Sequence, residues 1–415
     1  MGVNSCGTTL IDQGVFKNIG AITWDTTVKT SGFTAVSGNG YFCNTTSAAF
    51  TVTLPASPSA GDVVAIADYA NTFDTNNVTI GRNGSNIQGS AEDFIADIEG
   101  LSITLIYVDG TQGWLSIDAA QANDITIPPE FTTATGGTIT TSGDFKIHTF
   151  TSPGTFCVSQ IGNVTTNPSG GPSNVDYLVV AGGGGGGGRY GSGAGAGGYR
   201  TSFPSPGCNA GSFPITATGF SITVGAGGAG SSAPIGGANG SNGNNSVFSS
   251  ITSLGGGGGA TRGTDVDQGN GSGGGAKWRS TNFGDSTANG NNGGISSNTG
   301  SDEGSAGGGG AGAVGGNTPS IPRGGPGGAG LSSSITGSAV TRAGGGGGNG
   351  ASPTPGLGGS GGYGGGGTGG SSSTAGTNAS SNTGSGGGGG GTTGVAAYQG
   401  GNGGSGIVII RYKFQ

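Results

Sequence analysis

The sequence predicts an all-β protein: a small N-terminal β domain, then a jelly-roll-like β-sandwich carrying an inserted bundle of polyglycine II helices. Three observations support this prediction. Short apolar or alternating runs are separated by turn residues, and no run shows the 3.6-residue period of a long helix. Two apolar strands, 175–181 (VDYLVVA) and 407–412 (IVIIRY), bracket a glycine-rich region. That region is dense, because 84 of the 105 glycines lie in residues 176–415.

The small β domain is predicted at residues 21–118. Within it, 49–54 (AFTVTL) alternates between apolar and polar residues, and 62–67 (DVVAIA) is a short buried run. Residues 101–108 face residues 114–117 across the turn sequence DGTQG, which predicts a hairpin.

Residues 119–143 are polar and rich in threonine, and we expect them to be a linker. The sandwich is predicted at 144–415. It begins with the alternating run 144–151, and after the turn Ser152-Pro153-Gly154 the chain returns along 155–158. Further strands are expected at 177–181, 199–203, 213–217, 220–224 and 407–412.

The insertion, at about 182–406, contains pure glycine blocks. A flexible glycine and serine linker is the usual interpretation of such composition. Two observations oppose it, because the flanking strands need a shared core and isolated hydrophobic residues punctuate the blocks. Collagen requires glycine at every third position with abundant proline, which these blocks lack. The ordered alternative is a set of extended threefold helices, each hydrogen-bonded to as many as six neighbours, which only glycine allows to approach closely.

Charge and hydropathy limit the partners. Residues 1–175 carry a net charge of −10 and residues 176–415 a net charge of +3, so neither part has the dense basic surface of a nucleic-acid-binding protein. No run of apolar residues is long enough to insert in a membrane. Residues 1–20 lack the features of a signal peptide, and we therefore expect a protein made in a cytosol and not exported.

The residues suited to catalysis or metal binding are few and scattered. His148 is the only histidine and lies in a predicted strand, so a structural role is expected. Glu92, Asp93 and Asp97 lie in an acidic stretch typical of solvated surface. We expect no enzyme activity, catalytic residue, cofactor or metal site. We also expect buried free thiols, because the cysteines form no CxxC pair: Cys6, Cys43, Cys157 and Cys208.

Binding residues are expected where larger side chains interrupt the glycine, because rigid scaffolds commonly present planar and charged anchors on loops. The alternative is that Trp278 and Phe283 only cap the bundle. The candidates for receptor binding are Tyr190, Arg262, Asp265, Lys277, Trp278, Arg279, Phe283 and Tyr363.

Several motifs carry a resemblance to a known family. They are 147–151 (IHTFT), 154–156 (GTF), 175–188, 222–228 (ITVGAGG), 244–248 (NNSVF) and 403–412. In this order they resemble the glycine-rich domain of bacteriophage tail fibres and adhesins, especially those of marine phages, over residues 144–415. The order is also similar to the glycine-rich region of the anaplastic lymphoma kinase ectodomain, in which a jelly-roll sandwich carries an inserted polyglycine bundle.

Residues 37–118, with 51–62 (TVTLPASPSAGD) and 80–87 (IGRNGSNI), resemble β-modules of phage fibres and virion proteins. The resemblance implies a homotrimer in a virion tail appendage, assembled in the host cytosol. It implies that residues 1–20 attach to other tail proteins, and that the glycine-rich part binds a host-cell receptor, either a glycan or an outer-membrane protein. The alternatives are a spacer, a capsid decoration or an extracellular filament subunit, and an ice-binding protein.

Overall fold

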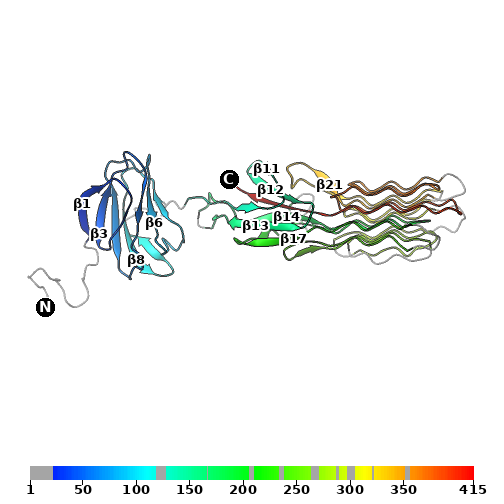
Figure 1. Ribbon diagram of the computed structural model, residues 1–415, viewed down its shortest axis with the longest axis horizontal. Helices are drawn as coiled ribbons and strands as arrows, with labels where there is room; N and C mark the ends of the chain where they lie inside the picture. The colour runs from blue at the N-terminus through cyan, green and yellow to red at the C-terminus, as the bar shows by residue number, and fades with distance from the viewer. Residues whose placement is uncertain are drawn as a thin grey trace, which may run out of the picture. The chain divides into compact units, whose positions relative to one another are not determined.

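The computed structural model describes residues 22–117, 128–165, 167–204, 210–232, 238–262, 271–286, 289–296, 304–319, 322–350 and 356–415. Within these ranges the regular elements are all β-strands, as predicted (Figure 1). The chain divides into two compact units. Unit 1 comprises residues 1–130 with 163–170, and unit 2 comprises residues 131–162 with 171–415.

Unit 1 consists of two sheets. The first has the order β1-β3-β5-β8-β9 and the second the order β2-β4-β6-β7. Its strands are β1 (Thr23–Lys29), β2 (Phe33–Thr34), β3 (Asn39–Cys43), β4 (Phe50–Thr53), β5 (Val63–Asp68), β6 (Val78–Gly81), β7 (Phe94–Ala96), β8 (Ser102–Asp109) and β9 (Gly113–Ser116). The first six strands alternate between the two sheets, and within each sheet they pair in parallel, like successive coils of a β-helix.

The core of unit 1 lies between its two sheets and contains residues from both, including Val52, Ile66, Ile80 and Trp114. The hairpin predicted at the end of this domain is confirmed, because β8 and β9 pair antiparallel, with Ile106 opposite Leu115. The parallel pairing of the earlier strands was not predicted. An alternating strand buries one face in either kind of sheet, so its pattern does not reveal the direction of its neighbour.

Unit 2 begins and ends in a β-sandwich, as predicted. One sheet has the order β10-β13-β17-β18-β19, and the other β11-β12-β22-β14-β15 with β16 also paired to β14. The strands are β10 (Thr133–Thr135), β11 (Thr138–Ser142), β12 (Phe145–Phe150), β13 (Gly154–Gln160), β14 (Asn174–Val180), β15 (Tyr199–Thr201), β16 (Phe213–Pro214), β17 (Gly219–Thr223), β18 (Ser246–Phe248), β19 (Ile251–Ser253) and β22 (Ile407–Lys413). The hairpin β20 (Leu331–Ser333) and β21 (Val340–Arg342) forms a separate small sheet.

The two bracketing strands, β14 and β22, are apolar on both faces because both faces are covered. They pair antiparallel, with Leu178 opposite Ile409. One face, including Val179 and Ile410, packs into the core of the sandwich. Leu178 and Ile409 belong to a second cluster, which includes Ala343 and Leu331. A strand that is buried on both faces has apolar residues at successive positions, so its sequence is a continuous apolar run. This is why both strands could be predicted from the sequence.

Three expectations about this region are corrected. Residues 133–142, expected in a linker, form β10 and β11, because their threonines suit edge strands that bury little. The turn 152–154 does not return the chain beside β12, since β12 and β13 lie in different sheets. Cys157 is exposed on β13, whereas Cys43 is a buried free thiol as predicted. Cys6 and Cys208 lie outside the described residues.

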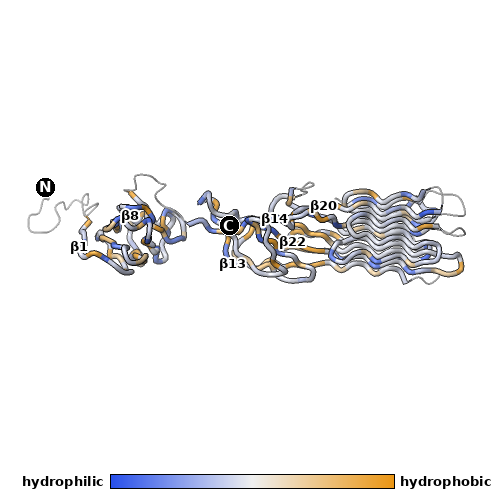
Figure 2. Tube along the Cα trace, turned by 90° about the horizontal axis from the view of Figure 1, so that it is seen from above, coloured by the Kyte–Doolittle hydropathy of each residue, from blue (hydrophilic) through white to orange (hydrophobic). Residues whose placement is uncertain are grey.

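The glycine-rich part of unit 2 is a bundle of extended segments that run side by side (Figure 2). In segment 182–187 successive amides donate to three neighbours in turn, so Gly182 and Gly185 donate to Asn244 and Ser241 of the same neighbour at 3.0 and 2.9 Å. The carbonyl groups accept from three further segments in the same way. A repeat of three residues is that of an extended threefold helix. Segment 182–187 therefore has six hydrogen-bonded neighbours: 191–198, 225–231, 238–245, 255–261, 384–391 and 398–406.

Inner and outer segments of the bundle differ in sequence. Four further segments also have six hydrogen-bonded neighbours: 191–198, 305–310, 343–350 and 384–391. These inner segments are buried along their whole length and consist of glycine, alanine and serine apart from Asn349. In outer segments every third residue faces solvent, as Ala226 and Ala229 do on segment 225–231. Six close neighbours leave room for few side chains and mainly small ones, so the longest glycine blocks lie in the interior.

Asparagine side chains replace missing backbone partners at one edge of the bundle. Asn239, Asn242 and Asn245 lie three residues apart on segment 238–245. Their Oδ1 atoms accept hydrogen bonds from the amides of Thr261, Gly258 and Gly255 at 2.8, 2.8 and 2.9 Å. Because the acceptors and donors share the same repeat, one row of side chains satisfies one row of amides. This pairing fixes the register between two otherwise interchangeable segments.

We expect the Asn242→Ala variant to lower the free energy of unfolding of unit 2 by about 1 kcal/mol, because the Gly258 amide loses its acceptor. Asn244→Ala is the matched control. The Asn244 side chain is exposed, and the lattice uses only its backbone. Denaturant unfolding measures the difference, and equal stabilities of the two variants would show that the asparagine row is not structural.

Candidate binding site at the far turns of the bundle

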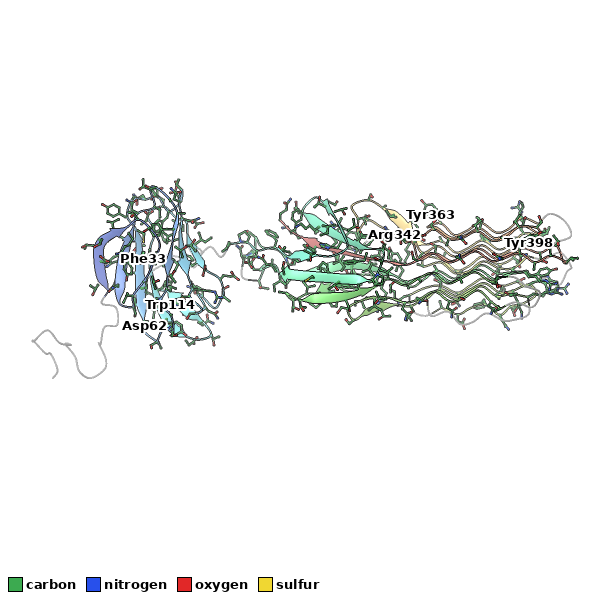
Figure 3. The ribbon with its side chains drawn as sticks, viewed as in Figure 1. Phe33, Asp62, Trp114, Arg342, Tyr363 and Tyr398 are labelled. Atoms are coloured by element: carbon green, nitrogen blue, oxygen red, sulfur yellow. The ribbon has the colours of Figure 1, made fainter. Side chains whose placement is uncertain are left out.

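The segments of the bundle reverse at two ends, here called the sandwich end and the far end. Figure 3 shows Tyr398 at the far end and Tyr363 at the sandwich end, beside Arg342 of β21. The amide of Arg189 donates to the carbonyl of Tyr398 at 3.2 Å, and that of Arg262 to the carbonyl of Arg189 at 3.4 Å. The turn at Arg189-Tyr190 and the end of segment 255–262 therefore meet at the far end.

Four of the predicted binding residues gather there, and we call them the tip cluster: Tyr190, Arg262, Trp278 and Arg279. The rings of Tyr190 and Trp278 are stacked, with centroids 4.9 Å apart and planes at 22°. The Arg262 guanidinium carbon lies 5.2 Å from the Tyr190 centroid and 5.1 Å from the Trp278 centroid. These distances place it beside the stacked pair and not between the rings. The Arg279 guanidinium carbon lies 4.3 Å from the Trp278 centroid.

The bundle holds the cluster from below through backbone hydrogen bonds. The Ser305 hydroxyl, on an inner segment, donates to the carbonyl of Tyr190 at 2.6 Å. Trp278 follows segment 271–276, in which the Gly275 amide donates to Gly193 at 2.9 Å, and the Ser280 amide closes the next turn onto Lys277 at 3.2 Å. Each aromatic residue thus extends from a segment whose position the lattice fixes.

Three residues at this end adopt a left-handed backbone that disfavours side chains. Arg189, Tyr190 and Arg279 have φ values of 37°, 56° and 55°. Glycine would occupy such positions without strain, and this chain uses glycine 105 times. Strained non-glycine residues are characteristic of functional sites, where the side chain itself is required. The strain therefore supports a role for these side chains beyond closing a turn.

Two residues outside the predicted set extend this surface. The Arg189 Nη2 donates to the carbonyl of Gly394 at 3.3 Å, which ties the Tyr190 turn to the turn 392–397. Val395, on that second turn, is 86% exposed. Val395 was not among the predicted binding residues, because an isolated valine in a glycine-rich stretch is equally compatible with a side chain that packs inward.

The remaining predicted residues do not join the stack. Lys277, half-buried, precedes Trp278 in the same turn. Phe283 is half-buried on the following segment, next to Gly284, whose amide donates to Gly274 at 2.8 Å. Asp265 lies outside the described residues.

Tyr363 lies at the opposite end of the bundle from the tip cluster. It is 77% exposed, and its carbonyl accepts from the amide of Gly330, the residue before β20, at 2.8 Å. This places Tyr363 at the sandwich end, where it cannot share a surface with Tyr190.

The part of the chain that the structure describes holds no group of three metal-ligating side chains. It likewise contains no helix with the length and hydropathy of a membrane span. His148 is buried in the sandwich, where Nδ1 lies 2.7 Å from the Gly136 carbonyl and Nε2 lies 3.1 Å from the Tyr412 hydroxyl. Burial and the nearby Lys146 lower its pKa, in part against the hydrogen bond with Gly136. Both ring nitrogens therefore have structural partners.

The family model described as a glycine-rich domain matches residues 158–413, which includes most of the sandwich and the whole bundle. No curated protein matches the chain. The match covers the tip cluster and excludes unit 1 up to residue 130.

Proposed function

The chain belongs to the glycine-rich domain family, and we propose that it is a subunit of a bacteriophage tail fibre or adhesin. In this proposal residues 1–20 attach to other tail proteins, and the protein acts as a homotrimer. The far turns of the glycine bundle contact a receptor on the host-cell surface. The binding step needs no catalysis, cofactor or metal.

One observation carries the proposal: a cluster of aromatic and cationic side chains lies at the far end of a rigid lattice. Tyr190 and Trp278 are 88 positions apart in the sequence, yet their rings stack at 4.9 Å. The inner segments beneath them are hydrogen-bonded on all sides. A rigid support lowers the entropy cost of binding, and Tyr, Trp and Arg are the residues that most often anchor interfaces.

The location of the protein tests the proposal. An antibody raised against residues 176–415 is applied to intact virions and detected by immunogold electron microscopy. Label at the tips of tail appendages, together with blocked adsorption to cells by the antibody's Fab fragment, is the expected result. Label on the capsid or the tail shaft would instead favour a decorating or spacer protein, and virions without label would refute a virion role.

Ice binding remains a second candidate for one reason. Outer segments expose a residue at every third position, as at Ala226 and Ala229 or at Thr374 and Thr377. The exposed residue types nevertheless differ from row to row, since the neighbouring positions 399 and 402 carry glutamine and asparagine. Thermal hysteresis of the purified protein would support this candidate, and its absence would dismiss it.

A further inference from the structure

Four outer segments of the bundle carry glycine carbonyls that accept no hydrogen bond from any residue that the structure describes. These glycines are half-buried, and we call their carbonyls the outward carbonyls. They belong to Gly227 and Gly230, Gly327, Gly358 and Gly361, and Gly400 and Gly403, on the segments 225–231, 323–330, 356–363 and 398–406. A further glycine segment could add to the lattice there, as a strand adds to the open edge of a sheet.

The inner segments show where a side chain points relative to these carbonyls. An added Cβ on Gly182 would collide with the backbone of segment 225–231. The next carbonyl along the chain, that of Gly183, accepts from the amide of Gly228 in that same segment at 2.8 Å. The relation recurs three residues later, at Gly185. A Cβ in the lattice therefore points to the segment that donates to the following carbonyl.

A residue with a side chain precedes each outward carbonyl. All of these residues are exposed, and they are Ala226, Ala229, Pro326, Leu357, Ser360, Gln399 and Asn402. By the relation found in the inner segments, each Cβ points to the place from which an amide would approach the outward carbonyl. Glycine, which is used 105 times in this chain, is absent from these positions.

Side chains also occur inside the bundle, but not in rows. The five inner segments contain single alanine, serine or asparagine residues, such as Ala194 and Asn349, and no two of them lie three residues apart within one segment. Ala194 keeps its backbone bond to Gly387 at 3.0 Å, so an isolated small Cβ fits through a local shift. Cβ atoms that recur every third residue would hold a whole neighbouring segment away.

Outward amides cannot join two copies of the chain by themselves. Ala226, Ala229 and Leu357 have amides with no acceptor among the described residues. Each would need a carbonyl of the second copy, and the outward carbonyls of that copy lie behind its own side chains. Covering the carbonyls is therefore sufficient, whereas water molecules are small enough to pair with both kinds of group.

We propose that the side chains in front of the outward carbonyls end the glycine lattice at its surface and keep copies of this chain from joining through their bundles. The surface is a lattice edge, and the partner that it excludes is a second copy. This inference goes beyond the proposed function and holds wherever the protein is located. In the proposed homotrimer, the protomers would contact each other through side chains and not through glycine segments.

The test removes the side chains from two neighbouring segments of the full chain. Segments 323–330 and 356–363 are adjacent, because the amide of Gly327 donates to the carbonyl of Ser360 at 2.9 Å. The variant carries Pro326→Gly, Ala329→Gly, Leu357→Gly and Ser360→Gly. In sedimentation velocity, its mean mass should rise with concentration to about twice that of the parent or more, and should fall again on dilution.

The matched control carries Pro326→Ser, Ala329→Ser and Leu357→Ser, with Ser360 unchanged. It loses the same apolar surface but keeps a Cβ at every position, so its mass should follow that of the parent. The melting transition of unit 2 is measured for each variant. If the four glycines prevent folding, the variant with only Leu357→Gly and Ser360→Gly is used in their place.

Three results would overturn the inference. The first is a glycine variant that keeps the mass of the parent at every concentration. The second is a serine control that associates as the glycine variant does, since the Cβ row would then not be the barrier. The third is association that appears only together with loss of the unit 2 melting transition, because unfolded chains and not lattice edges would then be joining.

Discussion

Replacing Gly346 by alanine is expected to destabilise unit 2 by about 3 kcal/mol or more and to lower its melting temperature by about 10 °C. Gly346 lies in inner segment 343–350, where its amide donates to Ala194 at 2.8 Å and its carbonyl accepts from Gly308 at 2.9 Å. A Cβ at this position would lie well inside 3.0 Å of the Gly387 carbonyl. Backbone atoms cannot rotate out of the way, so the segments must separate and lose hydrogen bonds.

Gly211→Ala is the control for this prediction. Gly211 is also in unit 2 and is exposed, and an added Cβ would meet nothing within 4 Å. The same substitution should change the stability by less than about 0.5 kcal/mol. Calorimetry on the full chain separates the two variants, with the transition of unit 1 as an internal reference. Similar melting of Gly346→Ala and Gly211→Ala would contradict the packed lattice.

The parts of the fold that could be predicted are those where side chains differ from their surroundings. β14 and β22 stand out as continuous apolar runs because both of their faces are covered. Long glycine blocks indicate the interior because six close neighbours exclude a Cβ at most positions. The asparagine row at 239, 242 and 245 can be seen in the sequence as a three-residue repeat. Its structural role becomes clear only once the backbone amides that donate to these side chains are known.

The neighbours of each glycine segment could not be predicted, because glycine segments are interchangeable. Tyr363 shows the consequence for the candidate site. The end of the bundle at which a turn lies depends on how many times the preceding chain has reversed direction. A reversal made of glycine has no sequence pattern that distinguishes it from the segments on either side. Tyr190 and Trp278 were correctly identified as loop residues, but their stacking depends on a lattice that the sequence does not encode position by position.

Unit 2 should also lose stability in mild acid through a single side chain, His148. A carbonyl can only accept, so Nδ1 donates to Gly136, and the neutral ring accepts at Nε2 from the Tyr412 hydroxyl. Burial holds the pKa of His148 below its ordinary value of 6.5, with a smaller contribution from Lys146. Protonation is therefore easier in the unfolded chain than in the folded one. The stabilisation of unit 2 that depends on neutral His148 is fully present above pH 6.5 and decreases as the pH falls below that value.

The expected slope is up to about 1.4 kcal/mol per pH unit, continuing until the lowered pKa of the folded state is reached. Denaturant unfolding of unit 2 between pH 7.5 and pH 5 measures it, and His148→Gln should be less stable but flat over this range. His148 is the only histidine in the chain, so one imidazole signal in the NMR spectrum reports its protonation without ambiguity. A signal that titrates near pH 6.5 would mean that the imidazole reaches solvent. The hydrogen bonds of this ring to the Gly136 carbonyl and to the Tyr412 hydroxyl of the neighbouring strand β22 would then not be stabilising unit 2.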